Sequence, residues 1–321
     1  MPIIKRIAMM VVNQEKEEKR KEHHKNMKIF KLHTGNEEAR NLTRDNYKEA
    51  VLELPKEERE NYSKSTENGR RYFAVCPACD NPTQIIGLYT KSDNVKLPYA
   101  KHYNRDSKVA KHNEQAYQFC PFASHSYAVD KKSRKKNFGD FEKNIYVLLR
   151  ENFDIAVYIA KKASGIYFTR NQLKRMASEY YMAEGYMYYH ATNYNIPWML
   201  LYFMDTSRNL SCNNLIINKG SELCDFLKTQ ENVSFESVDD EKTKVKVTSG
   251  ELSIGFPKHQ ISEKEEILEM CIVKPGKILK RISIPVDQTF FLHLTNNRKY
   301  PKNDEIIRIG KERLPEKILE K

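Results

Sequence analysis

Three cysteines in the first half of the chain have the types and spacing of metal ligands. Cys76 and Cys79 form a Cys-Pro-Ala-Cys turn, and Cys120 follows beside Pro121, so that all three lie inside one window of 45 residues. Two residues between cysteines let both sulfur atoms face one point, and a tetrahedral zinc ion then needs two more sulfur or nitrogen ligands. The pattern predicts one structural Zn²⁺ ion with Cys120 as its third ligand.

Three histidines compete for the fourth position, namely His102, His112 and His125. We favour His102 because it leaves 22 residues after Cys79 and 17 before Cys120, which is room for a hairpin and a short helix. His112 would lie within that helix, and His125 lies five residues beyond Cys120. A closed site with four protein ligands stabilises a fold and leaves no open position for catalysis.

The cysteine window resembles small zinc-binding modules of the treble-clef or zinc-ribbon kind. The resemblance covers about 50 of the 321 residues and implies a zinc-stabilised fold, without implying a function. The gaps between ligands differ from those of a C2H2 finger, whose histidines are about three to five residues apart. A redox pair would lie at the start of a long helix in a βαβ unit, which the flanking residues do not predict.

The remaining cysteines and the apolar segments indicate a cytoplasmic protein without a membrane span. Cys212, Cys224 and Cys271 lie in apolar surroundings and are expected to be buried thiols, since six cysteines in a chain of this length do not form a disulfide scaffold. No stretch approaches the roughly 20 apolar residues of a membrane helix. The apolar run 7–12 is shorter than a signal-peptide core.

Positive charge is concentrated around the predicted zinc site. The chain has 55 Lys and Arg against 43 Asp and Glu, and residues 71–140 alone have 12 against 6, which is half of the net excess of +12. Clustered cations release counterions from a phosphate backbone, so we predict a nucleic acid, DNA or RNA, as partner. The alternative is a charge that serves only solubility.

Aromatic residues interleave with these cations, as in surfaces that bind single-stranded or structured nucleic acid. Tyr99, Tyr103 and Tyr117 are examples, although they could instead fill the small core of the module. The run 131–136 could contact phosphate or serve as a plain linker. The predicted nucleic-acid-binding residues are Lys101, Arg105, Lys108, Lys111, Lys131, Lys132, Arg134, Lys135 and Lys136.

The elements that position these residues divide into three predicted parts. A charged N-terminal extension, 1–70, contains a short strand at 27–32 and a helix at 42–54 that Pro55 ends. The zinc-binding module with its basic linker, 71–136, begins with a strand at 71–75 and has another at 84–89. An α+β domain, 137–321, completes the chain with helices at 141–205 and strands at 214–295.

Within that domain, periodicity predicts one amphipathic helix from Phe141 that ends before Gly165. Thr169 and Gln172 form a capping box for a second helix, and Asn195 is placed to cap a third. Antiparallel strands are predicted at 233–238, 243–248, 252–256, 267–273, 278–286 and 289–294. The fold class is therefore α+β: a zinc-knuckle module followed by a helical segment packed on a C-terminal antiparallel β-meander.

Tyrosines are concentrated in the helical segment, where ten of the 19 lie between residues 146 and 202. Packing between helices and sheet is the favoured use, and a protein-binding surface on helices 170–205 is the alternative. Candidate catalytic residues are His190, and Glu236 with Asp240 and Lys242 as a nuclease-like acid and lysine set. The chain has no phosphate-binding loop, GxSxG or HExxH motif.

Together these patterns predict a zinc-stabilised, nucleic-acid-binding cytoplasmic protein of bacterial or phage type that is not an enzyme. The reason for predicting nucleic-acid binding is that the excess of Lys and Arg is highest in the segment that contains the three cysteines. Two alternatives remain, a protein–protein adaptor or assembly subunit and an enzyme that processes nucleic acid.

Overall fold

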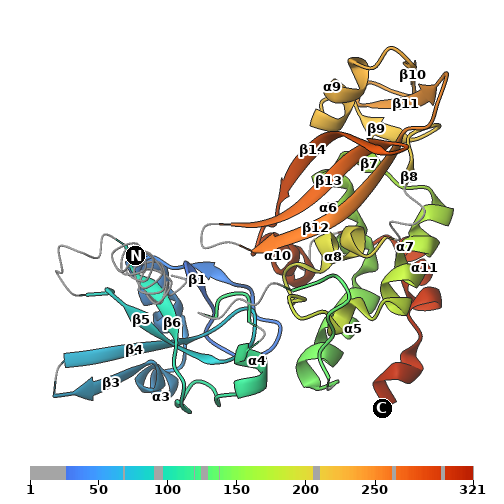
Figure 1. Ribbon diagram of the computed structural model, residues 1–321. Helices are drawn as coiled ribbons and strands as arrows, with labels where there is room; N and C mark the ends of the chain where they lie inside the picture. Colours follow the sequence, from blue (N-terminus) through green and yellow to red (C-terminus); the bar gives the residue numbers. More distant parts are fainter. Residues whose placement is uncertain are drawn as a thin grey trace, which may run out of the picture.

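Helices and antiparallel sheets alternate along the chain, and the α+β prediction with a C-terminal β-meander is confirmed (Figure 1). The computed structural model describes residues 27–67, 69–89, 97–118, 120–123, 129–136, 138–204, 210–261, 265–297 and 301–320. In Figure 1 the strands β3–β6 lie on one side of the molecule. The helices α5–α8 and α11 lie on the other side, beneath the long strands β12–β14.

The cysteine window is built on a four-stranded antiparallel sheet. Its order is β3 (Ser63–Thr66), β4 (Gly69–Val75), β5 (Pro82–Ile86) and β6 (Tyr99–His102). The predicted strands at 71–75 and 84–89 correspond to β4 and β5. Side chains alternate across the sheet, so Ala74, Ile85 and Ala100 are buried on one face, whereas Arg71 and Lys101 are exposed on the other.

Residues 27–62 pack on this sheet. β1 (Ile29–Phe30) pairs with β2 (Arg40–Asn41), and α2 (Arg44–Glu53) begins where the Thr43 hydroxyl accepts a hydrogen bond from the Asn46 N–H. A short helix, α3 (Lys56–Arg59), and a 3-10 turn, η1 (Glu60–Tyr62), lead into β3. The described part of 1–70 thus supplies β3, which pairs with β4, while the division at residue 70 stays a prediction.

The helical segment differs from its prediction in its first helix and at Asn195, which is the N-cap residue of the predicted third helix but makes no side-chain hydrogen bond to it. The prediction of a single helix from Phe141 is wrong, because α5 (Asp140–Glu151) and α6 (Phe153–Ser164) are separate helices. Asn152, at φ −125° and ψ 36°, leaves helical geometry between them. The capping box is confirmed, since Thr169 and Gln172 exchange hydrogen bonds at the start of α7 (Arg170–Met182). A 3-10 turn, η2 (Gly185–Met187), and α8 (Ile196–Tyr202) follow.

The C-terminal strands form two sheets. The first contains β14 (Lys277–Pro285), β13 (Glu266–Lys274), β12 (Ser253–Ile261) and the short β8 (Leu210–Ser211), in that order. The second contains β10 (Val233–Ser237), β11 (Lys242–Val247), β9 (Ile216–Asn218) and β7 (Ile166–Tyr167). A helix that was not predicted, α9 (Glu222–Lys228), follows β9.

The strand predicted at 289–294 is wrong, because these residues form the helix α10 (Phe290–Asn296). The Asp287 carboxylate accepts hydrogen bonds from the backbone N–H groups of Thr289 and Phe290, which starts a helix and not a strand. Two further elements were not predicted, α11 (Asp304–Arg313) and the 3-10 turn η4 (Glu316–Glu320).

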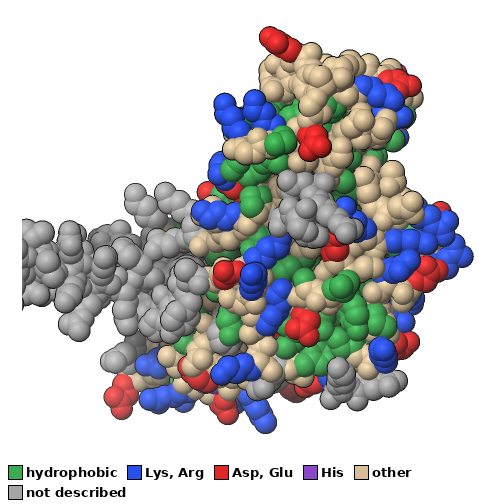
Figure 2. All heavy atoms as spheres, turned by 45° about the vertical axis from the view of Figure 1, so that its right-hand side comes forward, with side chains coloured by type: hydrophobic (Ala, Val, Ile, Leu, Met, Phe, Trp, Pro, Cys, Tyr) green, Lys and Arg blue, Asp and Glu red, His purple; other side chains and the backbone are tan. Residues whose placement is uncertain are grey.

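Tyrosines of the helical segment are mostly core residues. Tyr146, Tyr180, Tyr188 and Tyr194 are fully buried, and each ring packs against a neighbouring aromatic ring. Burial therefore favours the packing interpretation, and a protein partner at helices 170–205 stays a prediction. On the face drawn in Figure 2, Lys and Arg side chains are interspersed with Asp and Glu. Among the described residues, no helix is both long and apolar enough to cross a membrane.

Candidate metal centre

Four predicted ligands converge at one end of the β3–β6 sheet. The ligand atoms of Cys76, Cys79, His102 and Cys120 all lie within 4.8 Å of one another. The three cysteines are at most 5% exposed. These four side chains form a group that could hold a metal ion.

The separations within this group resemble those of a tetrahedral site. Cys76 Sγ lies 3.7 Å from Cys120 Sγ, and Cys79 Sγ lies 3.3 Å from His102 Nε2. Two sulfur atoms bound to one zinc ion at about 2.3 Å lie about 3.8 Å apart in a tetrahedron. Three thiolates and one imidazole form a donor set of the soft, nitrogen-and-sulfur kind that zinc prefers.

Local backbone structure positions the first cysteine pair. β4 ends at Val75, and the chain turns so that the Cys76 N–H donates to the Asn81 carbonyl at 2.8 Å while the Asp80 N–H donates to the Cys76 carbonyl at 3.0 Å. Asp80 takes the left-handed conformation with φ 59°, which Asp tolerates better than most residues. The turn aims both sulfur atoms at one point before β5 begins at Pro82.

The second ligand pair comes from elements further along the chain. His102 ends β6 and lies opposite Thr83 in the sheet, directly beside the cysteine turn. Cys120 follows the short helix α4 (Glu114–Gln118), and its N–H donates to the Tyr117 carbonyl at 3.0 Å. The ring of Tyr117 packs edge-on against His102 at 5.0 Å, which fixes the imidazole plane.

Two further residues donate hydrogen bonds to the sulfur atoms. Asn81 Nδ2 lies 3.3 Å from Cys79 Sγ, and the Phe122 N–H lies 3.4 Å from Cys120 Sγ. Such contacts orient metal-binding thiolates and stabilise their charge. The sequence-based prediction missed Asn81, which is 1% exposed, because an Asn two residues after a Cys-x-x-Cys turn has no distinctive pattern.

Burial and close packing govern the protonation of these thiols. Burial raises the pKa of Cys76 and of Cys120 well above the ordinary value. At Cys79 burial also opposes ionisation, but hydrogen bonds from Cys120 and Cys76 and the contact with His102 outweigh it, so the pKa is lowered. Several sulfur anions within one buried cluster repel each other, and a bound divalent cation relieves that repulsion.

The competing ligand candidates lie apart from this group or outside the described residues. His112 Nε2 lies 3.0 Å from the Glu114 carboxylate and does not belong to the cluster. His125 lies outside the described residues. Cys212, Cys224 and Cys271 are buried free thiols, as expected, and burial raises the pKa of Cys212 to about 12.

A buried polar network lies next to the metal-ligand cluster. The ring of Phe122, two residues after Cys120, contacts Tyr194, and the Tyr194 hydroxyl donates to the Glu266 carboxylate at 2.9 Å. The same carboxylate accepts from Asn195 Nδ2 at 2.7 Å and lies 2.9 Å from His259 Nε2. Aromatic packing and hydrogen bonds thus connect Cys120 to strands β12 and β13.

The predicted cations in β6 and after it lie on the surface. Lys101 lies in β6 beside His102, and the other three lie in the segment that joins β6 to α4, between the ligands His102 and Cys120. All four side chains are exposed: Lys101, Arg105, Lys108 and Lys111.

The predicted cations of the run 131–136 are partly used within the molecule. Lys135 Nζ pairs with Glu142 at 2.8 Å, with both side chains at most 10% exposed. Arg134 donates to the Ala183 carbonyl and stacks over the Phe203 ring at 4.9 Å, and Lys131 Nζ lies 4.7 Å from the Tyr202 ring centre. These three side chains therefore contribute to packing, whereas their neighbours Lys132 and Lys136 are exposed.

The candidate catalytic residues lie in two different parts of the C-terminal half of the chain, and most of them contact other side chains. His190 is 8% exposed and packs between the rings of Tyr188 and His259. In the acid and lysine set, Lys242 pairs with Asp239 at 2.8 Å, and Glu236 lies 3.5 Å from Lys246. Asp240 is exposed in the turn between β10 and β11, and a catalytic role for this set stays a prediction.

Comparison with known proteins adds nothing to this geometry. A scan of protein-family models, a search of curated proteins and a search of solved structures found no match to this chain. The functional inferences below therefore depend on the residues and contacts described above.

Proposed function

We propose that the chain is a cytoplasmic, zinc-stabilised protein that binds nucleic acid through the surface of its metal-bearing sheet. The observation that carries the proposal is the position of Lys101, Arg105, Lys108 and Lys111, which are exposed on or beside the segment between two ligands of the cluster. Cations on a backbone that the ligand cluster holds in place are suited to a phosphate backbone, because the backbone that carries them does not have to be ordered on binding.

In this proposal the zinc ion has a structural role. Cys76, Cys79, His102 and Cys120 would hold it, and the bound ion would supply a cross-link between β4, β6 and the residues after α4. The free thiols of the described cysteines suit a reducing compartment such as the cytoplasm.

Fluorescence anisotropy over a salt series tests the proposal. Labelled single-stranded and double-stranded DNA and RNA are titrated with the zinc-loaded protein between about 50 and 200 mM salt. Binding should weaken steeply with salt, and each cation that contacts phosphate should contribute about 0.7–0.9 to the slope of log K against log salt. The variant with Lys101, Arg105, Lys108 and Lys111 changed to Gln should lose most of that slope.

A matched variant controls for net charge. Lys258, Lys274, Lys277 and Lys302 are exposed in the C-terminal half, and their change to Gln removes the same charge. It should leave the salt slope close to that of the wild type. Equal losses in the two variants, or wild-type binding without a salt slope, would reject the proposed surface.

A further inference from the structure

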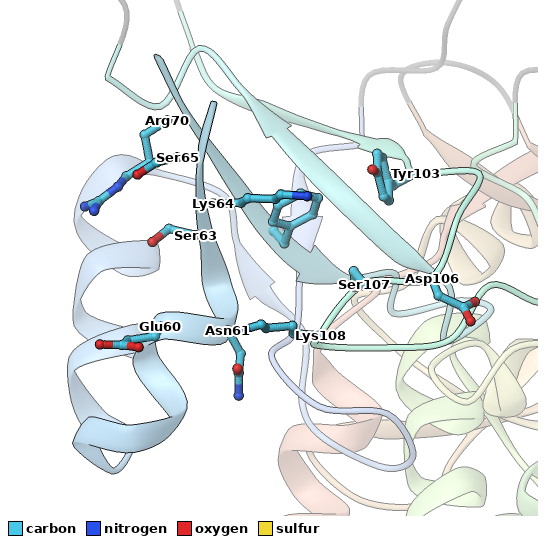
Figure 3. Close-up of a pocket in the computed structure, with 11 residues that line it drawn as sticks. Glu60, Asn61, Ser63, Lys64, Ser65, Arg70, Tyr103, Asp106, Ser107 and Lys108 are labelled. Carbon is cyan, nitrogen blue, oxygen red and sulfur yellow. The ribbon is translucent and has the colours of Figure 1, made fainter. Parts of the chain in front are cut away.

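A cavity of about 660 Å³ opens on the metal-bearing sheet, between the β3–β4 hairpin and the segment that follows β6 (Figure 3). Its size falls within the range of about 300–1,000 Å³ that is typical of small-molecule sites. It lies apart from the metal-ligand cluster and has charged, hydroxyl and aromatic side chains in its wall: Glu60, Asn61, Ser63, Lys64, Ser65, Arg70, Phe73, Tyr103, Asp106, Ser107 and Lys108.

Two aromatic rings form the apolar part of the wall. Phe73, in β4, is 5% exposed, and its ring meets the half-buried ring of Tyr103 edge-on, with centroids 5.3 Å apart and planes at 71°. The backbone holds Tyr103 in place, because its N–H donates to the Pro82 carbonyl at 2.9 Å. A ring fixed in this way offers an aromatic surface to a flat ligand without first having to be ordered.

The cations of the wall are available to an anion. Lys64 and Lys108 are exposed, and among the described residues neither forms an ion pair. In Figure 3 the Lys64 side chain extends toward Tyr103, whereas Glu60 and Arg70 point to the opposite side of the hairpin. The Asp106 carboxylate accepts a hydrogen bond from the His112 N–H at 2.8 Å. Amino groups and aromatic rings therefore line the same cavity.

We propose that this cavity binds one nucleotide of a single-stranded nucleic acid, with the base against Tyr103 and Phe73 and the phosphate at Lys64 and Lys108. Base stacking on a protein ring beside paired cations is the general chemistry of single-strand recognition. Bases in a duplex are stacked on each other and cannot enter a cavity of this kind. The inference rests on the proposed nucleic-acid binding and specifies both the strand type and the subsite.

The metal cluster supports the cavity mechanically. Tyr103 directly follows His102, so the position of the ring depends on the ligand that precedes it. Lys64 comes from β3, whose pairing with β4 also sets Phe73. Both halves of the cavity are thus fixed by the sheet that carries the cysteine turn.

Anisotropy with a single-stranded oligonucleotide of about 12 nucleotides tests the cavity, with the matching duplex as comparison. Tyr103→Ala should weaken single-strand binding about 5- to 100-fold, which is the range for loss of one stacked base, and Tyr103→Phe should bind within about twofold of wild type. Lys64→Gln should weaken binding and lower the salt slope by about 0.7. Zinc content and thermal midpoint verify that each variant is folded.

Tyr89→Ala and Lys48→Gln are matched controls, because both residues are exposed in the same part of the molecule and neither lines the cavity. If the wild type binds and the cavity variants match these controls, the subsite is rejected while the proposed nucleic-acid binding stands. A wild type that binds no nucleic acid rejects both, and equal binding of the duplex rejects the single-strand preference.

Photo-crosslinking gives a readout that needs no variant. The wild-type protein is irradiated with a single strand containing 4-thiouridine, and the modified peptides are identified by mass spectrometry. The expected crosslinks lie on peptides containing Tyr103 or Phe73. Crosslinks found only on other peptides would overturn the assignment.

Discussion

Asn81 binds Asn113 with both ends of its side-chain amide. Its Oδ1 accepts a 2.7 Å hydrogen bond from the Asn113 N–H, and its Nδ2 donates to the Asn113 carbonyl at 3.1 Å. The two residues are 32 positions apart, so this contact ties the cysteine turn to the segment that precedes α4. The contact lies beside the metal-ligand cluster, because the same Nδ2 is 3.3 Å from Cys79 Sγ.

Replacing this amide should loosen the cluster. Asn81→Ala leaves two backbone groups of Asn113 without their partner and should lower the free energy of unfolding by about 1–3 kcal/mol. Zinc affinity, measured by competition with a chelator, should fall with it. Asn232→Ala is the control, because the half-buried Asn232 donates a side-chain hydrogen bond to the Ser249 carbonyl and is not part of the cluster. Unchanged zinc affinity in Asn81→Ala would contradict this role.

The choice between two histidines is directly testable. His102→Ala should lose zinc and unfold at a lower temperature, because His102 Nε2 lies in the ligand cluster, while His112→Ala should keep a stoichiometric ion. Elemental analysis of protein purified without added metal measures the difference. Full zinc content in His102→Ala would show that another residue supplies the fourth ligand.

Adjacent lysines should differ in their effect on stability. Lys135→Ala removes the partner of the nearly buried Glu142 carboxylate and should cost about 2–3 kcal/mol of unfolding free energy. Lys136→Ala, at an exposed position, should stay within about 0.5 kcal/mol of wild type. Urea unfolding compares the two variants, and equal stabilities would show that the Lys135 ion pair contributes little.

Glu266 should be among the most sensitive residues of the C-terminal sheet. Its carboxylate contacts Tyr194, Asn195 and His259, so Glu266→Gln replaces an acceptor oxygen with a donor amide in a buried network. We expect a loss of about 2–4 kcal/mol in urea unfolding. Glu222→Gln, which removes only an exposed ion pair with Lys280, should change stability by less than about 1 kcal/mol. Similar losses would contradict the special role of the network.

Buried tyrosines should make the stability of the folded protein decrease at alkaline pH. Burial, followed by nearby carboxylates, raises the pKa of Tyr62 and of Tyr186 to about 12, against an ordinary value of about 10. The folded protein therefore holds these protons more tightly than the unfolded chain. Their contribution to stability should be constant below about pH 10 and should be lost as the pH rises from 10 through 12.

The absorbance of ionised tyrosine, measured as the pH is raised, reports on the same loss of stability. Exposed tyrosines such as Tyr89 ionise in the folded protein, so the informative signal is the part of the absorbance that Tyr186→Phe removes. That part should rise together with the loss of helical circular dichroism, because the buried hydroxyl ionises only as the chain opens. Tyr186→Phe should also reduce the dependence of stability on pH in this window. If the part that it removes rises well before unfolding, the Tyr186 hydroxyl is accessible in the folded state.

Local patterns in the sequence predicted the elements whose determinants lie within a few residues. The spacing of Cys76 and Cys79 and the capping box at Thr169 both act over two or three positions, and both appear in the structure as expected. His102 could also be chosen from the sequence as the fourth ligand, because the lengths of the gaps to Cys79 and Cys120 restrict where a third strand can end.

Features that depend on distant contacts could not be predicted in this way. Lys135 and Lys136 look alike in sequence, and only the position of Glu142 distinguishes a packed side chain from an exposed one. Residues 289–294 have the composition of a strand, but the Asp287 carboxylate binds the N–H groups of Thr289 and Phe290 in a turn that leads into a helix. Asn81 needed a partner 32 residues away before its role became visible.

The segment Met27–Lys31 has a consequence for self-association. Met27 and Ala100 exchange backbone hydrogen bonds at one end, and Lys31 and Val75 exchange them at the other, so the segment bridges β6 and the end of β4. At Ala100 and Val75, backbone N–H and C=O groups at the edges of these strands are therefore hydrogen-bonded within the chain. Exposed strand edges recruit strands from other molecules, and a chain that covers its own edges resists such stacking. Deletion of this segment should therefore favour aggregation as well as lower stability.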